Sequence, residues 1–237
     1  MFLGGLLISL FTGCRMSIDT EPFSVDIGTV PACNTNSKGL KKSRESSVLI
    51  TFESGGVRVG KASGNYFKYR GNTFILTAAH VAEVEQEATI YVNERIGIDK
   101  STVRVVYVDH GNDIAVLALN RELETVKPAK WRRKDRWDVK VGEHLYYTGN
   151  PMDMEHIAFE GFVSKIYLGA IVMQGFAYMG SSGSAVFDSR GRVVGVVSAI
   201  KFDVPYGAFP QLIPAIVIVG PLNVLDNNEL HDLLENK

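Results

Sequence analysis

Three residues that together could activate a hydroxyl group lie far apart in this chain. Ser182 is the third residue of the sequence GSSGS, His80 ends the sequence TAAH, and Asp113 lies in the sequence NDIAVL. A neutral serine hydroxyl is a poor nucleophile and needs a base within hydrogen-bonding distance. An imidazole base in turn needs a carboxylate that holds its tautomer and orientation. The pattern therefore predicts Ser182 as a nucleophile, His80 as its general base and Asp113 as the residue that orients the base.

The nucleophile must be chosen among three nearby serines. Gly180 lies two residues before Ser182 and another glycine follows it, so the backbone can turn and aim the N–H groups of Gly180 and Ser182 at one oxygen. The nucleophile-elbow pattern GxSxG would need glycine at position 184, and its chain order Ser, Asp, His differs from the order found here. We therefore assign Ser182 as the nucleophile and these two N–H groups as an oxyanion hole, with Ser181 and Ser184 as loop hydroxyls.

The base must be chosen among five histidines. His80 follows the apolar segment 73–77, which predicts a strand that ends beside it. His110 is the only serious rival, because it lies in a turn close to Asp113, but its flanking Asp and Gly are typical of a solvent-facing loop. The remaining histidines occupy polar, turn or terminal segments and are interpreted as surface residues: His144, His156 and His231.

Short segments rich in β-branched and aromatic residues run through most of the chain. The predicted strands of the first half are residues 48–52, 57–62, 66–69, 74–77, 89–92, 103–108 and 114–119. A hairpin is predicted at 70–73, one or two helical turns at 81–87, and a second set of strands between 145–148 and 215–219. Short strands at this spacing suit barrels. Leucines at helical spacing predict a C-terminal helix within residues 223–234.

These motifs resemble those of the trypsin-like peptidases, and most closely the pattern of bacterial HtrA/Deg-type proteases. The sequences at 77–81 and 112–117 resemble the histidine and aspartate motifs of that family, and segments 141–151, 160–164 and 195–200 resemble strands of its second half. The resemblance covers about residues 46–220. It implies an all-β fold of two six-stranded antiparallel β-barrels of chymotrypsin type, to which the predicted short C-terminal helix is added. The implied activity is that of a serine endopeptidase acting through an acyl-enzyme, with a hydrogen bond from Ser198 to Asp113.

The chain also departs from the family pattern. Ser184 stands where a second glycine is usual, and Ser181 replaces the aspartate with which true trypsins bind a newly cleaved N-terminus. No trypsin-like activation site is present, so zymogen activation of that kind is not expected. HtrA enzymes normally carry a PDZ domain after the protease; because the chain ends at Lys237, regulation by such a domain is not expected.

Composition divides the chain into segments. We expect a signal-like or lipoprotein-like segment at 1–14, a linker or arm at 15–46, an N-terminal barrel at 47–125, an inter-barrel connector at 126–140, and a C-terminal barrel with its helix at 141–237. The sequence LFTGC resembles a lipoprotein cleavage box in which Cys14 would be lipidated, leaving Cys33 as a free thiol. This predicts a secreted or periplasmic protein, which a lipid on Cys14 would anchor to a membrane. The alternative is a buried N-terminal segment or a misplaced start codon.

Charge argues against nucleic acid as the main partner. The 25 basic and 26 acidic residues leave a net charge of −1 and no overall attractive field. The sequence KWRRKDRW at 130–137 could form a nucleic-acid or lipid patch. We prefer a connector whose tryptophans pack on both barrels while its charges stay solvated. The basic run Lys38–Arg44 is likewise interpreted as a solvated linker in preference to a lipid contact.

The residues expected to bind substrate are Phe176, Ala177, Ser198, Ala199 and Ile200, with others near Ala208 and Phe209. None is acidic and none is a histidine, so we expect small or medium aliphatic side chains before the cleaved bond and neither Lys/Arg nor Glu preference. No cofactor or metal is expected, because His and Cys lack ligand spacing. The expected partner is a protein or peptide substrate. The alternative function is a catalytically inactive protease-fold binding module anchored at a membrane surface.

Overall fold

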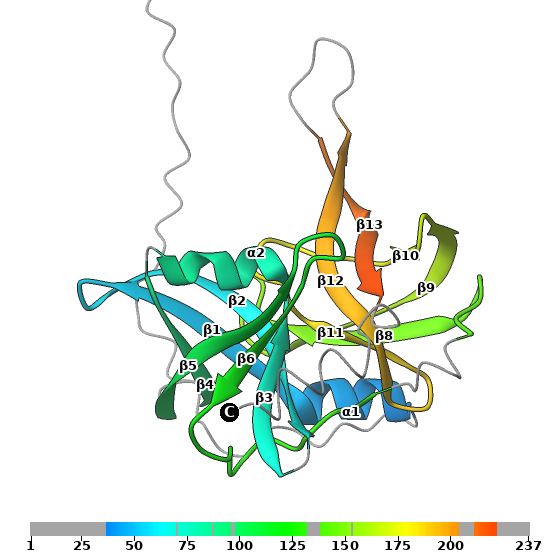
Figure 1. Cartoon of the computed structure of the whole chain (residues 1–237). Helices are drawn as coiled ribbons and strands as arrows, with labels where there is room; N and C mark the ends of the chain where they lie inside the picture. Colours follow the sequence, from blue (N-terminus) through cyan, green and yellow to red (C-terminus); the bar gives the residue numbers. More distant parts are fainter. Residues whose placement is uncertain are drawn as a thin grey trace, which may run out of the picture. The chain divides into compact units, whose positions relative to one another are not determined.

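Strands dominate the part of the chain that the structure describes. A computed structural model describes residues 37–69, 71–86, 88–95, 98–131, 138–152, 154–203 and 211–221. The chain divides into two units, residues 1–32 and 33–237, and all described residues belong to the second unit. Within it, the strands form two closed antiparallel sheets, each built by one half of the chain (Figure 1).

The first barrel has six strands: β1 (Ser47–Ser54), β2 (Val57–Tyr69), β3 (Asn72–Thr77), β4 (Thr89–Arg95), β5 (Ile98–Asp109) and β6 (Ile114–Leu119). They close in the order β1-β2-β3-β6-β5-β4. Branched side chains of β1, β3 and β6 fill the interior, among them Ile50, Ile75 and Leu117, which are fully buried. Burial of such side chains stabilises the barrel by about 1.5–3 kcal/mol each.

Strand β2 differs from the sequence-based expectation of two strands, 57–62 and 66–69. It runs unbroken for 13 residues, and the intervening residues pair with β1, as Leu49 opposite Ser63 and Ser47 opposite Asn65. Small and polar residues have low strand propensity, which is why the sequence suggested a break. Ser63 and Asn65 are nevertheless buried, because their side chains make hydrogen bonds across to the second barrel.

The second barrel also has six strands: β8 (His144–Gly149), β9 (Ile157–Tyr167), β10 (Ala170–Gln174), β11 (Ala185–Asp188), β12 (Arg192–Asp203) and β13 (Gln211–Pro221). Pairing of β11 with β12 closes the sheet, and β7 (Lys130–Trp131) adds in parallel to β12. The core includes Leu145, Tyr147 and Ile171. The predicted pair of six-stranded antiparallel barrels is confirmed, and the predicted helix at 223–234 lies outside the described residues.

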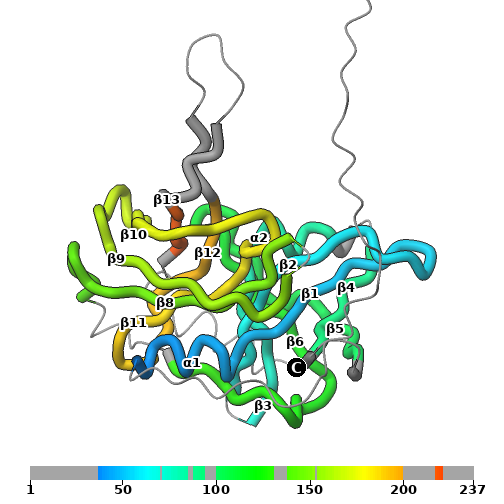
Figure 2. The backbone as a smooth tube through the Cα atoms, turned by 180° about the vertical axis from the view of Figure 1, so that it is seen from behind, coloured from blue at the N-terminus to red at the C-terminus, as the bar shows by residue number. Residues whose placement is uncertain are grey.

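Helix α1 (Lys38–Ser46) precedes the first barrel and packs against β8 and β11 of the second (Figures 1 and 2). The expectation of a linker or loosely packed arm is wrong for these residues. The helix buries Gly39, Ser43 and Ser46 instead of an apolar stripe, so the hydrophobic pattern that normally reveals a helix is missing. None of the described helices is both long and apolar enough to cross a membrane.

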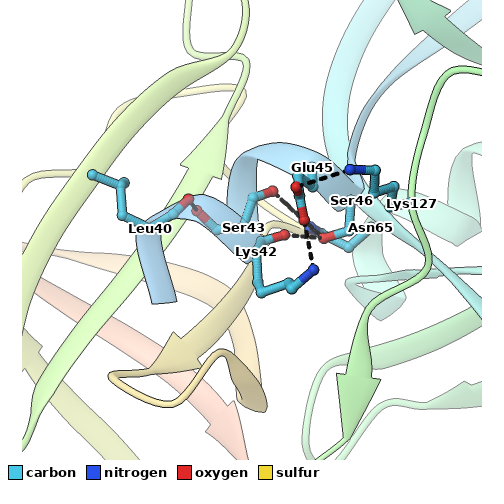
Figure 3. A network of polar contacts seen from close by, with 7 residues as sticks. All are labelled: Leu40, Lys42, Ser43, Glu45, Ser46, Asn65 and Lys127. Carbon is cyan, nitrogen blue, oxygen red and sulfur yellow. Dashed lines mark hydrogen bonds and ion pairs between the residues drawn. The ribbon is translucent and has the colours of Figure 1, made fainter. Parts of the chain in front are cut away.

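Polar contacts join α1 to both barrels. Asn65 Nδ2 in β2 donates to Ser46 Oγ at 2.8 Å (Figure 3). The hydroxyls of Ser43 and Thr148 lie 2.8 Å apart. Glu45 pairs with Lys127 of the connector at 3.1 Å. The N-terminal helix is therefore an integral part of the barrel assembly.

The connector begins as a segment that contacts both barrels. Ala129 N donates to Tyr66 O in β2 at 2.7 Å, and the next two residues form β7 against β12. Residues 132–137 and the side chain of Trp131 lie outside the described part of the chain, so the expected packing of the tryptophans stays a prediction.

Candidate active site

His80 stands where strand β3 gives way to a short helical segment. This segment consists of α2 (Ala79–Ala82) and the 3₁₀ turn η1 (Glu83–Gln86), close to the helical turns predicted at 81–87. Strand β3 pairs with β6, with Thr77 opposite Ala115. This register brings the end of β3 next to the start of β6. His80, which follows β3, therefore lies close to Asp113, which precedes β6.

Asp113 lies in the tight turn that joins β5 to β6. Its φ of 55° is in the left-handed region, which Asp and Asn tolerate better than most residues. The turn is held by Asp109, whose carboxylate accepts hydrogen bonds from Asn112 N at 3.1 Å and Asn112 Nδ2 at 2.7 Å. The local sequence thus fixes the backbone that aims the Asp113 carboxylate.

The carboxylate of Asp113 binds His80 through two groups. His80 Nδ1 lies 2.9 Å from Asp113 Oδ2, and the backbone N–H of His80 donates to Asp113 Oδ1 at 3.0 Å. A ring nitrogen that donates to a carboxylate leaves Nε2 as the nitrogen with a free lone pair. The arrangement therefore presents a basic imidazole nitrogen on a side chain that is 46% exposed.

A third group reaches Asp113 from the second barrel. Ser198 Oγ donates to Asp113 Oδ2 at 2.6 Å, which confirms the hydrogen bond implied by the family resemblance. Ser198 lies where the pairing of β12 with β13 shifts register between Val197 and Ala199. A bulge of this kind re-aims a side chain and is frequent near functional sites.

These contacts set the ionisation of the pair. Burial acts to raise the pKa of Asp113, but hydrogen bonds from the His80 ring, Ser198 Oγ and the His80 backbone together outweigh it and hold the pKa below its ordinary value. The hydrogen bond to Asp113 raises the pKa of His80 above its ordinary value, and partial burial opposes this only in part. Asp113 is therefore ionised at neutral pH and makes the imidazole more basic.

Ser182 lies in a turn that packs beside the segment bearing His80. Gly180 and Gly183 adopt positive φ angles of 96° and 86°. A Cβ placed on Gly183 would lie 2.1 Å from Thr77 Oγ1 and 3.2 Å from Ala78 N, so only glycine permits the turn to approach this closely. The nucleophile predicted from the sequence is thus brought next to the chain segment that carries the predicted base.

Hydrogen bonds hold the backbone of the turn, while two of its N–H groups have no partner among the described residues. Ser182 O accepts from Ser63 N, and Gly183 N donates to Val197 O, each at 2.9 Å. Within the described residues, neither Gly180 N nor Ser182 N donates to an acceptor, and the side chains of Ser182 and His80 share no hydrogen bond. The structure therefore joins His80, Asp113 and Ser198 in one hydrogen-bonded group, with Ser182 on the neighbouring turn.

The rival serines and histidines are placed differently. Ser181 and Ser184 are buried, and Ser181 Oγ accepts from Tyr178 N at 3.3 Å. His110 is 70% exposed and lies 2.9 Å from Glu83 Oε1, not beside Asp113. His144 is exposed at the start of β8, His156 is half-buried, and His231 lies outside the described residues.

The residues expected to bind substrate divide by exposure. Phe176 is 55% exposed and Ala199 is also exposed, whereas Ala177 is fully buried in the second core. The Ala177 side chain therefore faces the barrel interior, and the residue can reach a substrate only through its backbone. The side chains of Ile200, Ala208 and Phe209 lie outside the described part of the structure.

Sequence reasoning overlooked two residues that hold the backbone around this site. Ser63 in β2 contacts the turn at Ser182, and the hydroxyl of Tyr147 in β8 donates to Phe176 O. Both are fully buried. Neither stands in a distinctive motif, so the only signal was a polar atom in an otherwise apolar or small-residue strand.

Comparison with known proteins places the chain in a family. The model of the trypsin-like peptidase domain matches residues 62–196, more than half of the chain. The chain therefore belongs to the trypsin-like peptidase family, and the predicted kinship is confirmed.

Its relatives include proteases of the HtrA/Deg group. A probable periplasmic serine endoprotease, DegP-like, of Pseudomonas putida is 27% identical over 152 residues, which make up 60% of this chain and 30% of the relative. A serine protease HtrA-like of Staphylococcus epidermidis is 30% identical over 162 residues, 60% of this chain and 26% of the relative. The chloroplastic protease Do-like 5 of Arabidopsis thaliana is 24% identical over 229 residues, 85% of this chain and 68% of the relative. The chain thus spans less than a third of the two bacterial relatives.

A solved structure has the same fold. The serine endoprotease from Yersinia pestis superposes with a TM-score of 0.64 at 20% sequence identity, over 84% of this chain and 66% of that one. At this identity the likeness concerns the barrel architecture.

Proposed function

We propose that this protein is a serine endopeptidase that cleaves peptide bonds through an acyl-enzyme on Ser182. The observation that carries the proposal is the hydrogen-bonded chain from Ser198 through Asp113 to His80, next to a glycine-flanked serine turn. Membership of the trypsin-like peptidase family and relatives named as serine endoproteases support it.

The proposed reaction assigns one role to each group. His80 Nε2 takes the proton of Ser182 Oγ as the oxygen attacks the scissile carbonyl carbon, and Asp113 stabilises the imidazolium. The N–H groups of Gly180 and Ser182 hold the resulting oxyanion, a contribution worth about 2.7–4 kcal/mol per donor. His80 then gives the proton to the leaving amine as the C–N bond breaks. In the second half, water attacks the acyl ester as His80 takes its proton. The ester C–O bond then breaks, Ser182 Oγ receives the proton from His80 and the carboxylic acid leaves.

The proposed specificity is for small or medium aliphatic side chains before the cleaved bond. The described residues expected there, Phe176, Ala177, Ser198 and Ala199, are uncharged, so a cationic or anionic substrate side chain would lack a counter-charge from them. Profiling with a peptide library tests this, and strong selection of Arg or Glu would contradict it.

We also propose that the protein acts outside the cytoplasm, in the periplasm or after secretion. The Pseudomonas relatives are named as periplasmic, and the first ten residues have the apolar character of a secretion signal. Lipidation at Cys14 belongs to the same proposal. Mass spectrometry of the mature N-terminus tests it, because an unprocessed Met1 would contradict export by this signal.

Covalent labelling with a fluorophosphonate probe tests the central proposal. The full chain should be labelled and should cleave a peptide substrate, whereas Ser182→Ala should lose both, with a fall in rate of about 10⁴- to 10⁶-fold. Ser189→Ala is the matched control, because Ser189 is exposed in the turn after β11 and contacts none of the proposed catalytic groups. Circular dichroism should report the same fold for all three proteins.

The outcomes separate the two functions considered. Labelling that is lost in Ser182→Ala and kept in Ser189→Ala supports the peptidase. A folded, unlabelled wild-type chain would instead contradict the peptidase and favour the alternative of a protease fold used for binding.

A further inference from the structure

Ser63 links the first barrel to the turn that carries Ser182. It lies in β2 and is fully buried. Its backbone N–H donates to Ser182 O at 2.9 Å, and its side-chain hydroxyl lies 2.7 Å from Gly180 O, although Ser63 and Gly180 are 117 residues apart in sequence. One residue of the first barrel therefore binds the turn on both sides of Ser181.

The direction of the hydroxyl's hydrogen bonds can be assigned. Asn150 N lies 2.8 Å from Ser63 Oγ, and a backbone N–H can only donate, so the hydroxyl oxygen accepts there. The single hydroxyl proton is then available for Gly180 O, which can only accept. Asn150 is itself anchored, since its side chain donates to Val48 O at 3.1 Å and accepts from His156 N at 3.0 Å. The hydroxyl of Ser63 is thus buried and uses both its donor and its acceptor capacity.

This network fixes two peptide units of the turn. In the unit between Gly180 and Ser181, the carbonyl binds Ser63 Oγ and the N–H donates to Tyr178 O at 2.9 Å. In the unit between Ser182 and Gly183, the carbonyl binds Ser63 N and the N–H donates to Val197 O. Because peptide units are planar, fixing both ends fixes each plane. The N–H of Ser182 lies in the unit between them, and the N–H of Gly180 lies in the unit just before.

We propose that Ser63 is a positioning residue whose hydroxyl, by holding Gly180 O, keeps the N–H groups of Gly180 and Ser182 aimed at the oxyanion. The inference rests on the proposed peptidase function. Gly180 needs this restraint, because a glycine at a φ of 96° loses more conformational freedom when ordered than other residues do. Ser63 touches neither substrate nor His80 in this scheme and acts only through the turn.

The test compares Ser63→Ala with Ser63→Thr and a matched control in the full-length chain. Ser101→Ala is the control, because Ser101 is also a buried serine of the first barrel and its hydroxyl accepts from Arg121 Nε at 2.8 Å, away from the turn. Each variant is checked for folding, and kcat and KM are measured on a peptide substrate per fluorophosphonate-reactive site. Where Ser63→Ala does not fold, Ser63→Cys replaces it, because a thiol fills the space but donates weakly.

Ser63→Ala should lower kcat by about 10- to 100-fold, less than the 10²–10³-fold loss on deleting a direct oxyanion donor. KM should stay within about twofold of wild type. The midpoint of the acidic limb of the pH profile should shift by no more than about 0.3 pH units, because the His80–Asp113 pair is untouched. Ser63→Thr should retain most of kcat, and Ser101→Ala all of it.

Two results would overturn the inference while leaving the peptidase in place: a kcat of Ser63→Ala within threefold of wild type, or equal losses in the Ala and Thr variants, which would indicate packing and not the hydroxyl. A wild-type chain that is neither labelled nor active would instead refute the proposed function on which the inference rests.

Discussion

At the scale of single residues, the candidate site is organised around one carboxylate. Asp113 accepts from the ring and backbone of His80 and from Ser198, so both of its oxygens are occupied by donors from the two barrels. Charge-assisted hydrogen bonds of this kind are roughly twice as strong as neutral ones. The carboxylate is thereby kept ionised despite partial burial, and the imidazole it contacts is held in one orientation.

The raised pKa of His80 predicts how activity depends on pH. Protonated imidazole cannot act as a base, so kcat/KM should rise with pH through a midpoint above the ordinary histidine value of 6.5. In Asp113→Asn, the midpoint should fall and kcat should drop by about 10⁴-fold, because the negative charge and the correct acceptor are lost. The pH profile, together with an NMR titration of His80 in the Ser182→Ala background, measures both effects.

Glu83→Gln provides a graded control for this prediction. Glu83 also raises the pKa of His80, but only through charge and less than Asp113 does. Its removal should lower the midpoint by less and leave kcat nearly unchanged. A wild-type midpoint at or below the ordinary value would contradict the role assigned to Asp113.

At the scale of elements, helix α1 is unusual because small polar residues form its buried face. Ser46 receives a hydrogen bond from Asn65, and the same Asn65 side chain accepts from Ala185 N at 2.7 Å. Ala185 lies three residues after Ser182 and begins β11. A single amide side chain therefore joins the N-terminal helix, the first barrel and the strand that leaves the serine turn.

Close packing of α1 predicts the effect of Gly39→Ala. In an exposed helix this change would stabilise by about 1 kcal/mol. Here the added Cβ would lie 2.4 Å from Asp188 O and 2.5 Å from Tyr146 Cδ2. Asp188 O is part of the backbone and cannot easily move. Overpacking should therefore outweigh the gain in helix propensity and destabilise the protein by about 1–3 kcal/mol.

Urea unfolding monitored by circular dichroism measures this change. Lys41→Ala, at an exposed position of the same helix, is the control and should stay within about 0.5 kcal/mol of wild type. A stabilised Gly39→Ala protein would show that α1 does not pack on β11 as described.

At the scale of the whole described assembly, the candidate site lies where the barrels meet. His80 follows β3 and Asp113 precedes β6 in the first barrel, whereas Ser182 and Ser198 come from the second. Where the barrels meet, Phe187 and Val193 of the second barrel join the hydrophobic cluster of the first. Beside them, Ser63 and Asn150 are buried between β2, the end of β8 and the serine turn. The geometry of the site thus depends on how closely the two sheets approach.

Gly183→Ala tests that closeness. Its Cβ would lie 2.1 Å from Thr77 Oγ1 and 2.2 Å from Ser63 O, at a φ of 86°. Strain and overpacking together should cost about 3 kcal/mol or more and abolish fluorophosphonate labelling. Gly169→Ala is closely matched, because Gly169 has the same φ but no atom within 4 Å of the added Cβ.

Gly169→Ala should lose only about 1–2 kcal/mol of stability, because alanine is strained at this φ, and it should keep its labelling. Equal losses of stability in the two variants, measured by chemical unfolding, would argue against a tight barrel interface at Gly183.

Sequence motifs alone predicted the barrel class and singled out His80, Asp113 and Ser182. Each of these residues stands in a short motif, and the alternation of short strands with turns is a local property that needs no knowledge of distant contacts. Helix α1 and the unbroken β2 could not be predicted this way. The buried residues of α1 and those in the middle of β2, residues 63–65, are Gly, Ser and Asn, which carry no hydrophobic period.

Which groups from distant parts of the chain meet depends on how the two sheets pack. The hydroxyl of Ser63 finds Gly180 O across 117 residues, and Asn65 reaches Ala185 N across 120. A serine or asparagine in a strand has the same local signature whether it faces water or a partner from another sheet. Its partner is set by how the two sheets close and approach each other, because a hydrogen bond depends on distance and direction in space and not on separation along the chain.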